Sequence, residues 1–305
     1  MNTTKKSHYV WEYYLKSWAE NNFIFCSFNG KPVIKVSLNK VANKRYFYKV
    51  TPFNNFEKQL LIRAIDRSLP PNKYKFLMLY LDSINWRFMA QKTLNLKDSE
   101  KSNIQLGEDL MGEDEQSFIK FLDSLKDNNV AFCVSNENIF KFYSLILMQY
   151  FRTKRIYDDL KKGIDELVCE ELKTDSNEIF NVQNIITPFR QIMSYNVAHY
   201  LITTKSKTIL LKNNTSQEFI TSDQPVLNTY ADYSTLNRHT DKFELYYPIT
   251  PNIAILISNN DKYDNVSELN LDEVDYYNRK IINASQMQVY CSKANSLDRY
   301  IDKSE

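Results

Sequence analysis

The sequence predicts an α+β fold, with a mixed or antiparallel sheet made from N-terminal and C-terminal strands around a large helical middle segment. Strand-like runs lie at 23–50 and at 208–291, and the region from about 54 to 204 has helical periodicity. This order differs from the regular strand–helix alternation of a doubly wound fold. We therefore expect residues 1–305 to form a single domain, in which one sheet carries a helical insertion.

The N-terminal region is expected to begin with a helical or mixed segment and to continue as strands. Within residues 8–19, apolar side chains recur at the spacing of one helix face. Strands are then predicted at 23–28, 33–38 and 46–50. Asn29-Gly30, between the first two strands, is a strong signal for a two-residue turn. The resulting hairpin is expected to join the C-terminal strands.

The middle of the chain is expected to be helical, and strands return after residue 205. Helices are predicted at 57–67, 74–91, 138–157 and 188–202, the last with Pro188 near its first turn. The acidic stretch 97–117 indicates an exposed loop with a short helix, and the mixed charges of 158–175 are typical of a solvated helix face. The later strands are predicted at 208–211, 218–221, 243–249, 253–258 and 287–291, with a helix at 271–284.

Composition excludes several classes of protein. The 4 glycines are far apart, so no Gly-rich phosphate loop is present and the usual Walker and Rossmann nucleotide sites are excluded. The formal net charge of +2 neither requires nor forbids a nucleic-acid partner. The 4 cysteines form no Cys-x-x-Cys pair, which favours a reduced, cytoplasmic protein. No apolar run approaches the ~20 residues of a membrane span, so no membrane partner is expected. The oligomeric state is left open.

Two segments far apart in the sequence carry candidate functional residues. Phe219–Val226 reads as a short strand that ends in a turn of Ser, Asp and Pro. A strand that ends on a carboxylate often holds a functional acid, so Asp223 is a candidate, with capping of the turn as the alternative reading. Near the N-terminus, His8 is a candidate acid/base, metal ligand or plain hydrogen-bonding residue. We predict that His8 and Asp223 lie in one polar cluster.

A third candidate pair lies in the helical middle. Gln149 and Arg152 are three residues apart, so they share a helix face within an apolar run. An Arg in that position needs an anionic partner, because an unpaired buried charge is costly. Arg152 is therefore expected either to pair with Asp223 or Glu57 and hold helix to sheet, or to clamp a substrate phosphate. Glu57 also stands at a helix start, where the dipole favours an acid.

The motifs together resemble a widespread bacterial family of unknown function. Members of that family open His-Tyr-Val-Pro-Gln-x-Tyr-Leu, carry Gln-x-x-Arg-Thr in mid-chain and later show Phe-Ile-Thr-Ser-Asp-x-Pro-Val. The corresponding residues here are His8–Leu15, Gln149–Thr153 and Phe219–Val226. Trp11 and Glu12 stand where the family pattern has Pro and Gln. The resemblance spans nearly the whole chain, and it implies a shared fold and site and no established reaction.

These observations support two hypotheses about function. In the first, the protein is an intracellular, nuclease-like hydrolase of a phosphate-containing substrate: His8 is the acid/base, Asp223 orients it or binds a divalent metal, and Arg152 with Gln149 stabilises the developing anion. Substrate contacts would come from Ser222, Tyr9, Tyr13 and Glu57. The family type suggests a toxin or phage-defence effector, with nucleic acid or another defence-system protein as partner. In the second hypothesis, the same cluster is structural, and the protein is a non-catalytic interaction or sensor module.

Overall fold

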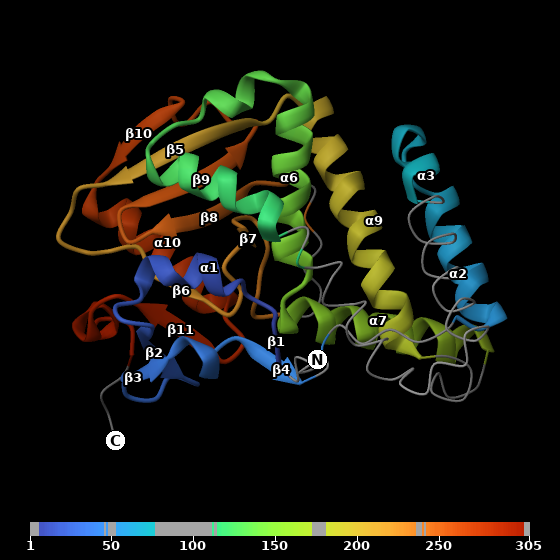
Figure 1. Ribbon diagram of the computed structural model, residues 1–305, viewed down its shortest axis with the longest axis horizontal. Helices are drawn as coiled ribbons and strands as arrows, with labels where there is room; N and C mark the ends of the chain where they lie inside the picture. Colours follow the sequence, from blue (N-terminus) through green and yellow to red (C-terminus); the bar gives the residue numbers. More distant parts are fainter. Residues whose placement is uncertain are drawn as a thin grey trace.

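The computed structural model describes residues 6–45, 47, 53–76, 112, 115–172, 181–235, 240 and 242–301. Strands come from the two ends of the chain and most of the long helices from its middle, which confirms the predicted α+β class (Figure 1). The predicted strand at 46–50, the helix at 74–91 and the acidic stretch at 97–117 lie mostly outside the described residues. Within the described part of the chain, no helix has the length and apolar character needed to cross a membrane.

The larger sheet has five strands in the order β10-β5-β9-β8-β7. Their bounds are β5 Lys207–Asn213, β7 Leu227–Asn228, β8 Leu245–Thr250, β9 Ile253–Ser258 and β10 Val266–Leu269. Neighbouring strands run antiparallel, except that β10 runs parallel to β5, so the sheet is mixed. The strands β7 and β10 were not expected from the sequence, because each is short and lacks a clear alternating pattern.

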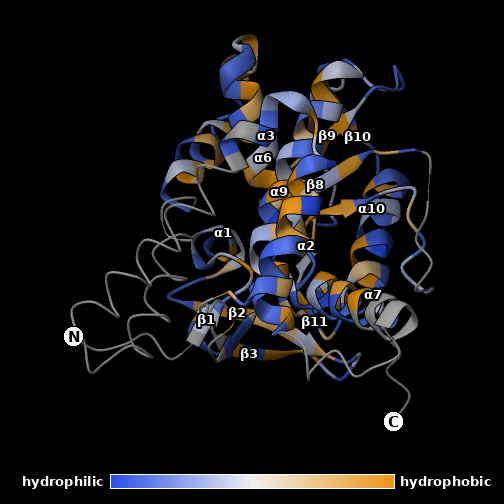
Figure 2. Cartoon of the chain, turned by 90° about the vertical axis from the view of Figure 1, so that its right-hand side faces the viewer, coloured by the Kyte–Doolittle hydropathy of each residue, from blue (hydrophilic) through white to orange (hydrophobic). Residues whose placement is uncertain are grey.

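Both faces of this sheet are buried. Alternate residues along β9 enter two different cores: Ile255 and Ile257 pack on the side of α6 (Asn136–Phe151), and Ala254 and Leu256 pack on the side of α10 (Leu271–Ala284). The apolar residues of β8 and β9 therefore lie inside the molecule, as the hydropathy colouring indicates (Figure 2). A strand that is covered on both faces reads as a continuous apolar run, which is why β9 was predicted at its observed bounds.

A second sheet carries the N-terminal hairpin. Its order is β3-β2-β11-β6, all antiparallel, with bounds β2 Phe23–Phe28, β3 Ile34–Ser37, β6 Thr221–Ser222 and β11 Gln288–Cys291. Asn29 and Gly30 have φ angles of 53° and 73°, as the predicted turn requires. A two-stranded ribbon pairs β1 (Lys6–His8) with β4 (Asn43–Arg45). The hairpin thus joins C-terminal strands, but these strands form two sheets where one was predicted, because β6 pairs with β11 and not with β5.

The helices that pack against α9 (Val182–Thr203) are α2 Asn55–Asp66, α3 Pro70–Phe76, α6 and α7 Lys154–Leu172. Residues 115–126 are also helical. The N-terminal turn is formed by α1 Glu12–Leu15 and η1 Lys16–Trp18. Short 3-10 turns are η2 Leu38–Lys40, η4 Ala131–Val134 and η5 Ala294–Leu297. The helix predicted at 138–157 is divided at Arg152, which is the C-cap of α6. Pro188 lies inside α9 and not at its first turn, so that predicted start was wrong.

Candidate functional site

The three motif segments found in the sequence meet in the folded chain. We call the contact between residues 8–11, 149–153 and 218–226 the motif joint. Residues 149–153 span the last turn of α6 and the two residues after it, and their side chains bond both to residues 8–11 and to residues 218–226. The helical middle is thus connected at one place to the N-terminal segment and to the second sheet.

Gln149 binds the backbone of the N-terminal segment through both ends of its amide. Its Nε2 donates to the Tyr9 carbonyl at 3.2 Å, and its Oε1 accepts from the Trp11 amide at 3.4 Å. The Gln149 side chain is 0% exposed. Since both backbone groups are also buried, Gln149 satisfies a donor and an acceptor that would otherwise lack partners in the protein interior.

Arg152 is buried and holds the same segment. Its Nη2 donates to the His8 carbonyl at 2.5 Å and to Glu115 Oε1 at 2.9 Å, and its guanidinium lies 5.2 Å from the Trp11 ring. The Arg152 side chain is 1% exposed, whereas that of Glu115 is 38% exposed. The described ion pair is therefore with Glu115, a partner that the sequence reasoning missed, and not with Asp223 or Glu57, which were proposed as partners from the sequence.

The end of α6 also contacts the strand segment. Thr153 Oγ1 donates to Gln224 Oε1, and Gln224 Nε2 donates to the Val226 carbonyl at 2.7 Å. Ser222, predicted as a substrate contact, is buried: its hydroxyl donates to the Gln224 carbonyl at 3.0 Å and accepts from the Gln224 amide at 3.1 Å. This is a local turn bond of the kind that Ser forms readily. Ser222 is therefore placed as a structural turn residue.

Asp223 binds three consecutive backbone amides at the start of β11. Its Oδ1 accepts from Gln286 at 2.8 Å, and its Oδ2 accepts from Met287 at 2.9 Å and from Gln288 at 3.1 Å. Burial raises the pKa of Asp223 to about 6, while the three amides and the nearby charge of Arg155 act in the opposite direction. The amide protons that surround the carboxylate would also face a bound cation, so these contacts do not suit the metal-ligand role considered for Asp223.

Glu218 makes a matching contact at the other end of β11, and the sequence reasoning missed it. Its Oε1 accepts from the Ser292 amide at 2.9 Å and from the Lys293 amide at 3.2 Å. Asp223 and Glu218 thus bind the backbone on either side of β11, and together they hold β6 beside that strand. A charged residue directly before the apolar pair Phe219-Ile220 was the signal in the sequence, because a carboxylate at the edge of a buried strand needs donors.

His8 lies at the edge of the joint. It is half-buried, pairs with Asn43 between β1 and β4, and its Nε2 lies 3.4 Å from the Leu38 carbonyl. A short path of hydrogen bonds links its neighbour to the Asp223 site: Tyr9 N donates to the Ala42 carbonyl at 2.9 Å, and Ala42 N donates to Gln288 Oε1 at 3.1 Å. The imidazole and the carboxylate bond to different groups, and the polar cluster of His8 and Asp223 stays a prediction.

The other candidate substrate contacts occupy separate places. The Tyr9 ring is buried against Phe47, with ring centres 5.7 Å apart. Tyr13 donates its hydroxyl to Asp123 at 2.6 Å, and this bond raises the pKa of Tyr13 to about 12. Glu57 accepts from the amides of Asn54 and Asn181, both at 2.8 Å, so it caps α2 and ties it to the start of α9. These contacts do not bring the three side chains to one site.

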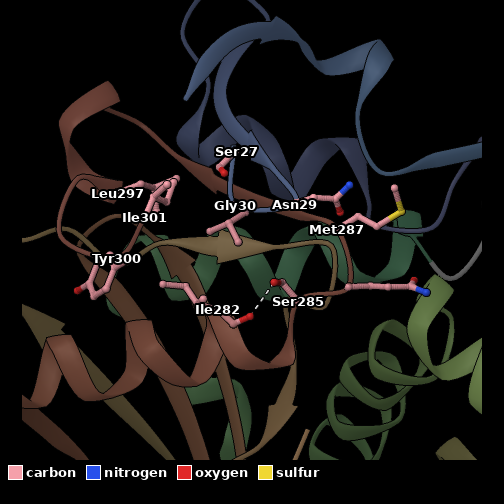
Figure 3. Close-up of a pocket in the computed structure, with 11 residues that line it drawn as sticks. Ser27, Asn29, Gly30, Ile282, Ser285, Met287, Leu297, Tyr300 and Ile301 are labelled. Atoms are coloured by element: carbon pink, nitrogen blue, oxygen red, sulfur yellow. Dashed lines mark hydrogen bonds between the residues drawn. The ribbon is translucent and has the colours of Figure 1, made fainter. Parts of the chain in front are cut away.

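A cavity of about 200 Å³ lies beside the segment that binds Asp223 (Figure 3). The β2–β3 hairpin contributes Asn29 and Gly30 to its wall, and the link between α10 and β11 contributes Ser285 and Met287. The lining residues do not include His8, Arg152 or Asp223. Among the described residues, no three His, Cys, Asp or Glu side chains come together in a group that could hold a metal ion.

The fold and the joint define an α+β protein in which two sheets and a helical segment are connected by buried polar side chains. The chain belongs to the family of proteins of unknown function DUF4238, whose model matches residues 6–295. This match confirms the predicted membership of a family of unknown function. No curated protein and no solved structure matches the chain.

Proposed function

We propose that this protein is a non-catalytic interaction or sensor module, in which the motif residues stabilise the packing of the helical segment against the N-terminal segment and the second sheet. The observation that supports this proposal is the way the motif side chains are used. Gln149, Arg152 and Asp223 each bind backbone groups of a distant segment, and each is almost completely buried. Side chains in such contacts stabilise the packing of one element against another, and few of their polar atoms remain to bind a substrate.

The hydrolase hypothesis requires that these residues also reach a substrate. A general acid or base must reach a substrate proton within about 2.6–3.2 Å, directly or through a water. Asp223 is 2% exposed, and both of its oxygens accept backbone amides. A pKa of about 6 would suit proton transfer near neutral pH, but protonation would disrupt these amide contacts. Nuclease-like activity therefore stays a prediction. The toxin or phage-defence context and the cytoplasmic location are likewise predictions.

A direct assay separates the two functions. Purified full-length protein would be incubated with single-stranded RNA, with DNA and with a chromogenic phosphodiester, each with Mg²⁺ or Mn²⁺, and compared with His8→Ala. His8 is the suitable variant because it is the proposed acid/base and is half-buried, whereas Gln149 and Arg152 are fully buried. We expect equal, background rates for both proteins. Hydrolysis by the wild type that a folded His8→Ala protein lacks would replace the proposal by the hydrolase hypothesis.

A further inference from the structure

Basic side chains from three elements surround the aromatic pair Phe47 and Tyr157. Lys44, on β4, has its Nζ 5.2 Å from the centre of the Tyr157 ring and 5.7 Å from that of Phe47. Arg190, on α9, has its guanidinium 5.2 Å and 5.0 Å from the same two rings. Two cations that are 146 positions apart in the sequence (190 − 44) are therefore held at one place by contacts with aromatic rings.

The helix α7 brings two further lysines to this place. Lys154 and Lys161 lie three residues before and four residues after Tyr157, so they share its helix face. Both affect the pKa of Lys44, and so does Arg190. We refer to the four basic residues as the cation cluster: Lys44, Lys154, Lys161 and Arg190.

Among the described residues whose charges act on Lys44, cations outnumber carboxylates. Burial lowers the pKa of Lys44, and the charges of Lys154, Lys161 and Arg190 lower it as well, whereas Asp158 raises it. Asp158 is already engaged, since it accepts from Lys154 Nζ at 2.6 Å and from Gln286 Nε2 at 2.8 Å. Within the described part of the chain, Asp158 therefore balances Lys154, and the charges of Lys161 and Arg190 at Lys44 remain. Like charges that are held together favour the binding of an anion.

We propose that the cation cluster binds the phosphate group of a phosphorylated ligand, whether a free phosphate compound or the backbone of a nucleic acid. This inference rests on the proposed function and names the class of ligand for it. A lysine ammonium is a compact charge with three donors, which suits a phosphate oxygen. Lys44 and Lys161 are exposed and the Lys154 side chain is 28% exposed, so a ligand can approach these three lysines from solvent, whereas Arg190 is buried and contributes only its charge.

The geometry also indicates that the site does not recognise nucleotide bases. Lys44 and Arg190 already contact the ring of Tyr157, whereas base recognition by stacking needs an aromatic face that is available to the base. Recognition at this site should therefore depend on phosphate charge and not on base identity. Affinity for a nucleic acid should then fall steeply with salt and vary little with sequence.

The test uses the full-length protein with inorganic pyrophosphate and with a fluorescent single-stranded oligonucleotide as separate probes. Calorimetry measures pyrophosphate binding, and fluorescence anisotropy measures oligonucleotide binding at two salt concentrations. We expect Lys44→Gln and Lys161→Gln each to weaken binding about tenfold or more, because each removes a charge-assisted contact. The matched control is Lys162→Gln, which removes the same charge from the next residue, an exposed lysine 3.9 Å from Glu166. Its affinity should stay within about twofold of the wild type.

A second readout follows Lys44 directly. Binding of pyrophosphate should raise the pKa of Lys44, because an anion stabilises the charged ammonium, and NMR of selectively labelled lysine measures this change. Equal weakening by all three variants would overturn the proposal in favour of diffuse surface charge. Absence of binding of both probes to folded wild-type protein would also overturn it. Cleavage of a bound probe would refute the non-catalytic function and leave the binding site in place.

Discussion

Replacing Gln149 by leucine tests the structural role of the motif joint most directly. The change keeps most of the side-chain volume and removes both ends of the amide, so the Tyr9 carbonyl and the Trp11 amide lose their described partner. A buried backbone group without a partner costs about 1–3 kcal/mol. Leucine itself carries no polar group to desolvate, which offsets part of this cost. We therefore expect the free energy of unfolding to fall by about 2–4 kcal/mol.

Urea unfolding of the two proteins measures this difference, and hydrogen exchange locates it. The Trp11 amide should exchange faster in the variant, since its acceptor is gone. The control is Gln191→Leu, which changes a half-buried glutamine on α9 that lies 3.4 Å from the Tyr195 hydroxyl. We expect this control to change stability by less than about 0.5 kcal/mol. A Gln149→Leu protein as stable as the wild type, with the Trp11 amide still protected, would refute the reasoning.

Three further predictions concern carboxylates and their partners. Because burial raises the pKa of Asp223 from 3.8 to about 6, the folded protein keeps a proton that the unfolded chain loses, and its stability should fall as the pH rises through this range. The difference between the two pKa values corresponds to about 3 kcal/mol of unfolding free energy. Urea unfolding of the wild type from pH 4 to pH 7 should show this fall in stability, and Asp223→Asn should lack it. The same pH dependence in both proteins would contradict the prediction. Arg155→Ala should raise the pKa of Asp223 further, since Arg155 lowers it, and an NMR titration of the carboxyl carbon that shows no rise would contradict this. Glu57→Ala should destabilise the protein by about 2–3 kcal/mol, because the amides of Asn54 and Asn181 lose their acceptor; an unchanged thermal melt would argue otherwise.

Local patterns in the sequence were sufficient for several elements. The strands Phe23–Phe28 and Ile253–Ser258 and the helix Leu271–Ala284 were predicted at their observed bounds. Each is specified by contacts or turn chemistry close in sequence: a Gly-containing turn, a continuous apolar run, or a capping box in which Asn270 and Glu273 bind each other's backbone amides. Three residues of the joint, Gln149, Arg152 and Asp223, were also recognised, because polar side chains in apolar elements are unusual in any sequence.

The roles of those residues were decided by the tertiary structure. Arg152 needed an anion, but its described partner is Glu115, which no helical spacing relates to it. α6 ends at Arg152, where Gln149 and Thr153 bind segments more than 70 positions away. β6 pairs with β11 and not with the five-stranded sheet, and Asp223 and Glu218 bind the backbone at both ends of β11. Local sequence determines which segments are helices or strands and which residues need partners, whereas the partner of a buried polar group depends on which distant backbone the fold brings to it.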